Sequence, residues 1–238
     1  MKALVNFKDL GLIDYQEAWD YQEKIFEERM AEKLAFQKQK EGEPDNRVFN
    51  LLFCEHPHVY TLGKSGVEQN LLIDSIQLQA KHAKFYKINR GGDITYHGPG
   101  QLVAYPIIDL EVFHLGIKSY IELLEESIIQ TIAEFGLKGE RLKGATGVWL
   151  DTNVPGKTRK ICAIGVRASR YITMHGFAFN VNTDLNYFSY INPCGFIDKG
   201  VTSLSKEIGK EIDMEVVKQM VLDKLTHNFN WQLQESGR

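Results

Sequence analysis

The sequence predicts an α/β (α+β) fold in which helices flank a mixed β-sheet. Three stretches carry apolar residues at helical spacing, and they lie near the beginning, in the middle and near the end of the chain. Short apolar runs that are typical of strands cluster between them. Helices around a central group of strands usually cover a sheet. Because the 238 residues contain no internal repeat, low-complexity tract or convincing linker, we expect residues 1–238 to form one domain.

The predicted helices begin and end at recognisable signals. Asp14, with Glu17 three residues later, resembles a capping box, and the helix that it begins extends to about Gln39. We expect its apolar stripe to face the core: Trp19, Ile25, Phe26, Met30 and Leu34. The other helices are expected at Gly116–Phe135, with Gly136 as a stop, and at Asp213–Phe229.

The predicted strands are short and apolar. They are Ala3–Leu10, Val48–Cys54, Phe85–Asn89, Leu102–Ile108, Gly147–Leu150, Lys160–Ala168 and Tyr171–Asn182. Leu71–Ala83 is expected to be a short helix or a loop, and Leu185–Gly200 a structured loop.

Composition narrows the classes of function. The chain is 43% hydrophobic and 25% charged with a net charge of −3, so nothing global indicates binding to nucleic acid or to an anionic membrane. No run approaches the ~18 apolar residues of a membrane span, and the start lacks the apolar core of a signal peptide. We therefore expect a cytoplasmic protein. Its three cysteines favour free thiols over a disulfide framework.

A glycine-rich stretch, Arg90–Gln101, separates two predicted strands. Four of its twelve residues are glycine, a residue that permits positive φ or close approach of the backbone. Backbone N–H groups in such a segment can face the oxygens of a ligand. Two interpretations stay open: a β-hairpin with two glycine turns, and a ligand-binding loop. Polar side chains are interleaved with the glycines: Arg90, Asp93, Thr95, His97 and Gln101.

One cysteine stands apart from the other two. Cys194 lies in a turn-rich segment between Pro193 and Gly195, whereas Cys54 and Cys162 lie in apolar strands. An accessible thiol in such a loop is a candidate nucleophile, although a structural role stays open. Lys160 opens an apolar strand, where lysine is usually a surface residue, but a cation beside Cys194 would lower the pKa of its thiol.

The histidines suggest little metal chemistry. His56 and His58 are one residue apart, but no cysteine or third histidine follows at a zinc-like spacing, so we expect no metal. His175 lies in a strand-like segment, where a structural role is the simpler interpretation. His97 is the better functional candidate because it lies within the glycine-rich stretch.

The segment from Lys138 to Arg170 is basic. It holds eight lysines and arginines and two acids, which gives 8 − 2 = +6 in a chain of net charge −3. Solvated strand edges would explain this, and so would a docking face for an acidic partner.

Taken together, these motifs resemble the lipoyl (octanoyl) transferase family. The matching blocks are Glu55–Gly63 (Glu-His-Pro-His-Val-Tyr-Thr-Leu-Gly), Arg90–Gln101, Lys160–Gly165 (Lys-Ile-Cys-Ala-Ile-Gly), and Thr173–Asn180 with Asn192–Gly195. Their order, with the lysine before the cysteine, makes an accidental match improbable. Asp93, Cys162 and Phe179 depart from the expected residues, and the resemblance does not cover the long segment Glu28–Asn46.

The resemblance implies the fold of biotin and lipoate ligases and a transfer of octanoyl groups. The donor would be octanoyl-acyl carrier protein, and the acceptors a lysine of the lipoyl domains of 2-oxoacid dehydrogenases and of the glycine cleavage H protein. Cys194 would carry the acyl group and Lys160 would tune it, with no cofactor and no metal; we expect a monomer. The implied substrate-binding residues are Arg90, Gly91, Gly92, Asp93, Ile94, Thr95, Tyr96, His97, Ala163, Ile164, Gly165, Gly176, Phe177 and Ala178, with His56 and His175 as possible supports.

Two other functions stay open. An ATP-using lipoate or biotin ligase of the same fold would need no nucleophilic cysteine. A non-catalytic module that binds acyl chains or lipoyl domains would be indifferent to Lys160. In the transferase, an acyl chain needs an apolar slot, for which Gly91, Gly92, Gly165 and Gly176 would leave room.

Overall fold

The computed structural model describes residues 2–38, 47–192 and 199–234. Within them, a nine-stranded sheet has the order β12-β1-β2-β6-β10-β9-β8-β7, with β11 paired to β9. Its strands are β1 (Leu4–Leu12), β2 (Val48–Glu55), β6 (Gln101–Ile107), β7 (Glu140–Leu142), β8 (Ala145–Leu150), β9 (Arg159–Ser169), β10 (Ile172–Asn180), β11 (Gly200–Val201) and β12 (Gln232–Leu233). Parallel pairs (β1–β2, β1–β12, β9–β11) and antiparallel pairs occur together, which confirms the predicted mixed sheet.

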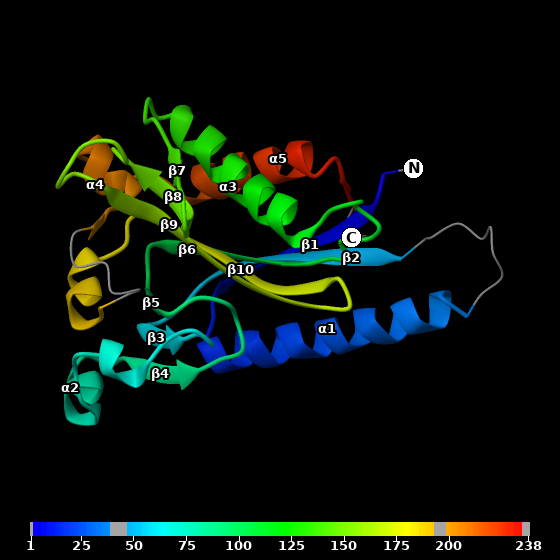
Figure 1. Ribbon diagram of the computed structural model, residues 1–238, viewed down its shortest axis with the longest axis horizontal. Helices are drawn as coiled ribbons and strands as arrows, with labels where there is room; N and C mark the ends of the chain where they lie inside the picture. The colour runs from blue at the N-terminus through cyan, green and yellow to red at the C-terminus, as the bar shows by residue number, and fades with distance from the viewer. Residues whose placement is uncertain (1, 39–46, 193–198, 235–238) are drawn as a thin grey trace.

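Helices cover both faces of this sheet (Figure 1). The helices are α1 (Tyr15–Phe36), α2 (Ser75–Ala80), α3 (Ile117–Ala133), α4 (Leu204–Ile208) and α5 (Met214–Asn228). Alternate residues of β2 serve the two faces: Leu51 and Phe53 pack in the core under α3 and α5, and Leu52 and Cys54 pack under α1. This alternation explains why β2 reads as a continuous apolar run.

A second, three-stranded sheet lies beside the first and carries part of the glycine-rich stretch. It consists of β4 (Lys84–Lys87), β3 (Val59–Leu62) and β5 (Ile94–His97), in that order. Because β5 pairs with β3 while β6 pairs with β2 and β10, the hairpin interpretation of Arg90–Gln101 is wrong. The turn at Gly98–Gly100 instead passes the chain from the small sheet to the large one. Gly100 has a φ of +77°, and a Cβ there would lie 2.6 Å from the carbonyl oxygen of Asn182.

The predicted stripe of α1 is correct at Ile25 and Phe26, which are buried, and wrong at Leu34, which is 40% exposed. Lys33 is buried in place of Leu34. Its ammonium pairs with the carboxylate of Asp109 at 2.9 Å and donates to the carbonyl oxygen of Arg170 at 2.8 Å. The buried charge of Lys33 is tolerated because the position of this residue on α1 places its ammonium beside the carboxylate of Asp109.

The Lys33 contact also fixes the tip of the β9–β10 hairpin. The two residues of the tip, Arg170 and Tyr171, have φ values of +47° and +68°. Such a turn usually takes Asn-Gly, because other side chains are strained at positive φ. The hydrogen bond from Lys33 to the Arg170 carbonyl helps to hold this conformation.

Other elements differ from the sequence-based expectations. Leu185–Tyr190 forms a 3-10 helix (η2) within the segment expected to be a loop, and Glu68–Asn70 forms another (η1). Local capping begins α2, where Asp74 accepts a hydrogen bond from the backbone N–H of Gln77. Residues 39–46, in the segment that the resemblance does not cover, lie outside the described residues. None of the described helices has the length and apolar character needed to cross a membrane.

We expect Asp109→Asn to lower the free energy of unfolding by about 3 kcal/mol. Asp109 is fully buried and pairs with both Lys33 and Arg47, at 2.9 Å each, so the neutral amide removes the buried negative charge that both cations share; the partly exposed Glu111 still pairs with Lys33. Urea unfolding followed by circular dichroism measures the change. Lys224→Met is the control: it removes a solvent-exposed pair with Glu134 and should cost less than about 1 kcal/mol. Equal losses in the two variants would contradict a structural role of the buried pair.

Candidate active site

A cavity of about 820 Å³ opens between the glycine-rich stretch and strands β9 and β10. This volume falls in the range of small-ligand sites. Side chains from α3, β8 and the segment 199–201 complete its wall. Apolar lining residues include Val103, Ile117, Ile121, Trp149, Ile164, Val166, Phe177, Ala178 and Phe188. A mostly apolar cavity of this size suits an acyl chain.

The cavity collects most of the residues implied by the resemblance. Those that line it are Arg90, Gly91, Gly92, Asp93, Ile94, Thr95, His97, Ala163, Ile164, Gly165, Gly176, Phe177, Ala178 and His175. Tyr96 is not among the lining residues. It is fully buried on the other side of β5, where its hydroxyl bonds the Nδ1 of His58 at 2.7 Å and its ring stacks on Tyr187. His56 also lies behind the lining, with its Nε2 2.7 Å from the hydroxyl of Tyr105.

Lys160 lies at the cavity wall. It is the second residue of β9 and stands opposite Val201 of β11. Its Nζ donates to the carbonyl oxygen of Thr146 at 3.1 Å and lies 4.6 Å from the centre of the Trp149 ring. Cys194 lies outside the described residues. The described chain resumes at Lys199, which lines the same cavity.

The glycines of the wall make room for neighbouring backbone more than for a ligand. A Cβ on Gly176 would lie 2.0 Å from the carbonyl oxygen of Ala104, and a Cβ on Gly165 would lie 2.9 Å from that of Gly91. The space expected to form an acyl slot at these two positions is therefore already filled. Gly176 instead allows β6 to lie close to β10 within the large sheet, and Gly165 allows the glycine-rich stretch to lie close to β9 at the cavity.

Arg90 anchors the glycine-rich stretch from within. Its Nη2 donates to the carbonyl and the hydroxyl oxygens of Thr61, at 2.7 and 3.0 Å, and its Nη1 donates to the carbonyl of Gly91. Asp93 accepts from the side chain of Asn70 and from the backbone N–H of Ile94. Both charged side chains thus hold the loop in shape, which is a structural use of residues expected to bind substrate.

The histidines at and behind the cavity are held neutral. Burial lowers the pKa of His56 to about 4 and that of His175 to about 3, and it lowers the pKa of His97 well below its usual range. The positive charge of Arg90 acts in the same direction on His97 and His175. Among the described residues, no group of three or more His, Cys, Asp or Glu side chains is arranged to hold a metal ion.

The two described cysteines are poor nucleophiles. Cys54 and Cys162 are fully buried, and burial raises the pKa of each thiol far above neutrality. The charge of Lys160 lowers the pKa of Cys162 but does not offset the effect of burial. At neutral pH both therefore remain thiols, as expected of core cysteines.

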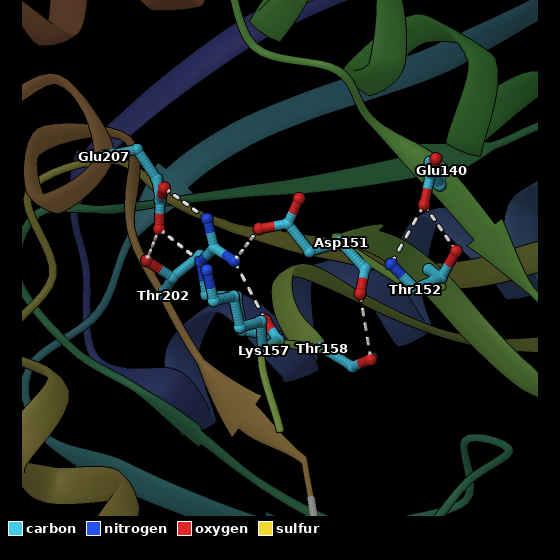
Figure 2. A network of polar contacts seen from close by, with 8 residues as sticks. Glu140, Asp151, Thr152, Lys157, Thr158, Thr202 and Glu207 are labelled. Atoms are coloured by element: carbon cyan, nitrogen blue, oxygen red, sulfur yellow. Dashed lines mark hydrogen bonds and ion pairs between the residues drawn. The ribbon is translucent and has the colours of Figure 1, made fainter. Parts of the chain in front are cut away.

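Much of the positive charge between 138 and 170 is paired with acids. Arg159 pairs with Glu207 at 2.7 Å and with Asp151 at 2.5 Å, and the Glu207 carboxylate also accepts from Thr202 (Figure 2). The other pairs are Lys138–Glu140, Arg141–Glu125, Arg141–Glu126 and Arg167–Glu23. Several of these acids lie outside the basic segment of the sequence, so the count of +6 overstates the local charge.

Several residues of the cavity are not identified by any pattern in the sequence. Tyr15 comes from the start of α1, where its ring stacks 5.9 Å from that of His97, and Ile117 and Ile121 come from α3. Trp149 and Phe188 complete this set. These residues read as ordinary core positions in their own elements, and only the tertiary arrangement brings them together.

Known proteins resemble this chain over nearly its whole length. A protein of Christiangramia forsetii named octanoyltransferase is 55% identical over 98% of this chain and 99% of its own length. A protein of Porphyromonas gingivalis with the same name is 55% identical over 94% of this chain, which spans only 44% of that protein.

Solved structures share the fold. The structure of a bipartite lipoate protein ligase from Thermoplasma acidophilum covers 99% of this chain and aligns over 86% of its own chain, with a TM-score of 0.67 and 14% identity. A biotin protein ligase from Aquifex aeolicus, in complex with biotin and ATP, aligns over 94% of this chain and 70% of its own with a TM-score of 0.52 and 14% identity. At this identity the likeness concerns the fold alone, and it confirms the fold expected from the sequence motifs.

A family model described as the lipoyl protein ligase A/B catalytic domain matches residues 14–226. That range includes the small sheet, the large sheet except β1 and β12, the cavity, and every helix except the last residues of α5. The chain therefore belongs to the lipoyl protein ligase A/B catalytic domain family.

Proposed function

We propose that this protein is an octanoyltransferase, which takes an octanoyl group from octanoyl-acyl carrier protein and transfers it to a lysine of a lipoyl domain. The observation that carries the proposal is the 55% identity to proteins named octanoyltransferase, over nearly the full length of both chains. The apolar cavity at Lys160 gives independent physical support. Lipoyl domains of 2-oxoacid dehydrogenases and the glycine cleavage H protein are the acceptors that fit this reaction.

In the first step, the thiolate of Cys194 attacks the carbonyl carbon of the carrier's thioester. A new C–S bond forms, the bond to the carrier's sulfur breaks, and the carrier leaves as a thiol; the ammonium of Lys160 would supply the proton and so become neutral for the second step. One thioester is exchanged for another, so the step is close to isoenergetic. The positive charge of Lys160 at the cavity wall would favour the thiolate over the thiol.

In the second step, the amine of the lipoyl-domain lysine attacks the acyl-enzyme. The C–N bond forms, the C–S bond to Cys194 breaks, and the amine must lose a proton as the amide forms. Lys160 is the candidate to accept this proton, provided that it is neutral at that stage. The proposal is supported by the contacts of its Nζ with the Thr146 carbonyl and the Trp149 ring, since all three residues line the cavity.

The oxyanion of each tetrahedral intermediate needs hydrogen-bond donors. The N–H of Gly91 already donates to the carbonyl of Val166 at 2.9 Å, and the N–H of Ile94 donates to Asp93 at 2.6 Å. These two groups are therefore engaged, and other donors in the cavity must serve the oxyanion.

The acyl chain would occupy the apolar part of the cavity. Each buried CH₂ contributes about 0.8 kcal/mol, so an eight-carbon chain gains most of its binding free energy from this contact. Val166 lines this part of the cavity together with Ala178, which the resemblance implies as substrate-binding, whereas Tyr96 of the same implied set does not line it. No cofactor is required by this reaction.

We expect an octanoyl adduct on Cys194 when the protein is incubated with octanoyl-acyl carrier protein without ATP. Intact mass spectrometry followed by peptide mapping measures the adduct. Cys54 and Cys162 are the internal controls, because their buried thiols should stay unmodified. Cys194→Ser should lose the adduct and the transfer. Wild-type turnover in Cys194→Ser, or an absolute requirement for ATP, would instead favour a ligase.

We expect Lys160→Met to slow transfer from the acyl-enzyme to the acceptor lysine by about 10²- to 10⁴-fold, because the variant cannot accept a proton. Lys160→Arg retains a positive charge but does not release its proton near neutral pH. Acylation should therefore be less impaired than transfer in Lys160→Arg. Single-turnover measurements separate the two steps.

Lys157→Met is the matched control, since Lys157 is exposed in the turn that precedes β9. It should leave both steps unchanged. Wild-type rates of both steps in Lys160→Met would refute a role for this lysine in the chemistry.

A further inference from the structure

Two buried amide side chains at the cavity are joined in a way that leaves no freedom in their orientation. Gln101 and Asn180 are 1% and 3% exposed. The Nε2 of Gln101 lies 3.1 Å from the carbonyl oxygen of Tyr96, and the Nδ2 of Asn180 lies 2.9 Å from that of Thr202. Because carbonyl oxygens only accept, both amide nitrogens must point at them. The Oδ1 of Asn180 then accepts from Gln101 at 2.9 Å.

The same logic extends the chain of hydrogen bonds toward Arg90. The Oε1 of Gln101 must accept from the Nδ1 of His97 at 2.8 Å, so neutral His97 carries its proton on Nδ1. Its Nε2 is then an acceptor, 3.4 Å from the hydroxyl of Thr61. That hydroxyl accepts from Arg90 and can donate to His97. All the hydrogen bonds in this series therefore run in one direction, from the guanidinium of Arg90 to the carbonyl oxygen of Thr202.

The far end of this series of hydrogen bonds lies beside Lys160. The N–H of Thr202 donates to the carbonyl oxygen of Lys160 at 2.9 Å, and the preceding residue, Val201, pairs with Lys160 in the sheet. The peptide groups on both sides of Thr202 are therefore held, one by Asn180 and one by Lys160. On its other flank, the Thr202 hydroxyl donates to Glu207, which pairs with Arg159 (Figure 2).

We propose that Gln101 and Asn180 are positioning residues, whose directional hydrogen bonds fix β11 against β9 and so set the place from which Lys160 enters the cavity. This inference rests on the proposed octanoyl transfer, because it assigns Lys160 to the chemistry. Buried amides also satisfy backbone groups in proteins without any catalytic role. A positioning role and a purely structural role can be distinguished by a substitution that removes one donated hydrogen bond but keeps the shape of the side chain.

Asn180→Asp makes that change. An ionised carboxylate still accepts from Gln101 but repels the carbonyl of Thr202, whereas a protonated carboxyl can donate to it and restores both bonds. Burial raises the pKa of such a carboxyl, so protonation and recovery occur as the pH falls. We expect kcat for transfer to fall by about 10- to 100-fold at pH 8, with a smaller change in KM for the carrier. The ratio of this kcat to the wild-type kcat should rise toward 1 at lower pH.

Two comparisons isolate the effect. Three titratable groups lie near this series of hydrogen bonds: His97 on β5, Lys160 on β9 and Glu207 on α4. They are also present in the wild type, so the ratio of the two kcat values at each pH removes the pH dependence that both proteins share. Asn182→Asp is the matched control: its amide bonds the backbone of Ile212 at 2.7 and 3.0 Å but does not line the cavity. It should lower thermal stability and leave kcat per folded molecule unchanged at every pH.

The outcomes decide between the two roles. Wild-type kcat in Asn180→Asp at pH 8, or an equal loss in Asn182→Asp, would overturn the proposal and leave only a structural role. If Asn180→Asp does not fold, Gln101→Glu provides a second test: the ionised carboxylate donates to neither the Tyr96 carbonyl nor Asn180, and the protonated carboxyl regains one of these two bonds, so recovery of kcat at lower pH should be partial. A wild-type protein that forms no octanoyl adduct would instead refute the proposed function, and the adduct is therefore measured first.

Discussion

The region around the cavity depends on a close approach of two backbones that only glycine permits. The N–H of Gly91, in the glycine-rich stretch, donates to the carbonyl of Val166 on β9, and the neighbouring Gly165 has no room for a Cβ beside Gly91. This contact joins the glycine-rich stretch to β9 of the large sheet, and residues of both segments line the cavity. A side chain at Gly165 would push the two segments apart and displace the guanidinium of Arg90, whose Nη1 would lie only 3.3 Å from the added Cβ.

The electrostatic character of the cavity follows from the same packing. Arg90 is buried where the sheets meet, and its charge and the loss of water keep His97 and His175 neutral. Neutral histidines can accept and donate hydrogen bonds in fixed directions, as the contacts of His97 with Gln101 and Thr61 show. Several polar side chains of the wall, among them Arg90, His97 and Gln101, are thus hydrogen-bonded within the protein, and an apolar ligand beside them would not break those bonds.

The sequence predicts the helices and strands well, but it predicts less well which strands pair with one another. Periodicity and capping signals identify the three long helices and most strands, because these signals are local. They cannot show that β5 pairs with β3 and not with β6, since pairing is decided by residues distant in sequence. The motif places Tyr96 in the substrate-binding set, yet strand alternation directs it away from Thr95 and His97, which face the cavity. The exposed Leu34 shows the same limit, since only tertiary contact reveals the counter-ion of Lys33.

Charge counted along a sequence is a poor guide to a docking face. Arg159 is the first residue of the eleven-residue β9, and Arg170 follows its last residue, Ser169. At ~3.3 Å per residue the two lie about 36 Å apart along the strand, so one small carrier domain does not readily bridge them. Arg159 is moreover engaged with Glu207 and Asp151, beside the strand pair that holds Lys160. The charge of Arg159 is therefore used in ion pairs within the protein. The positive count along residues 138–170 therefore does not by itself indicate a docking face for an acidic partner, because acids from other segments pair with much of that charge.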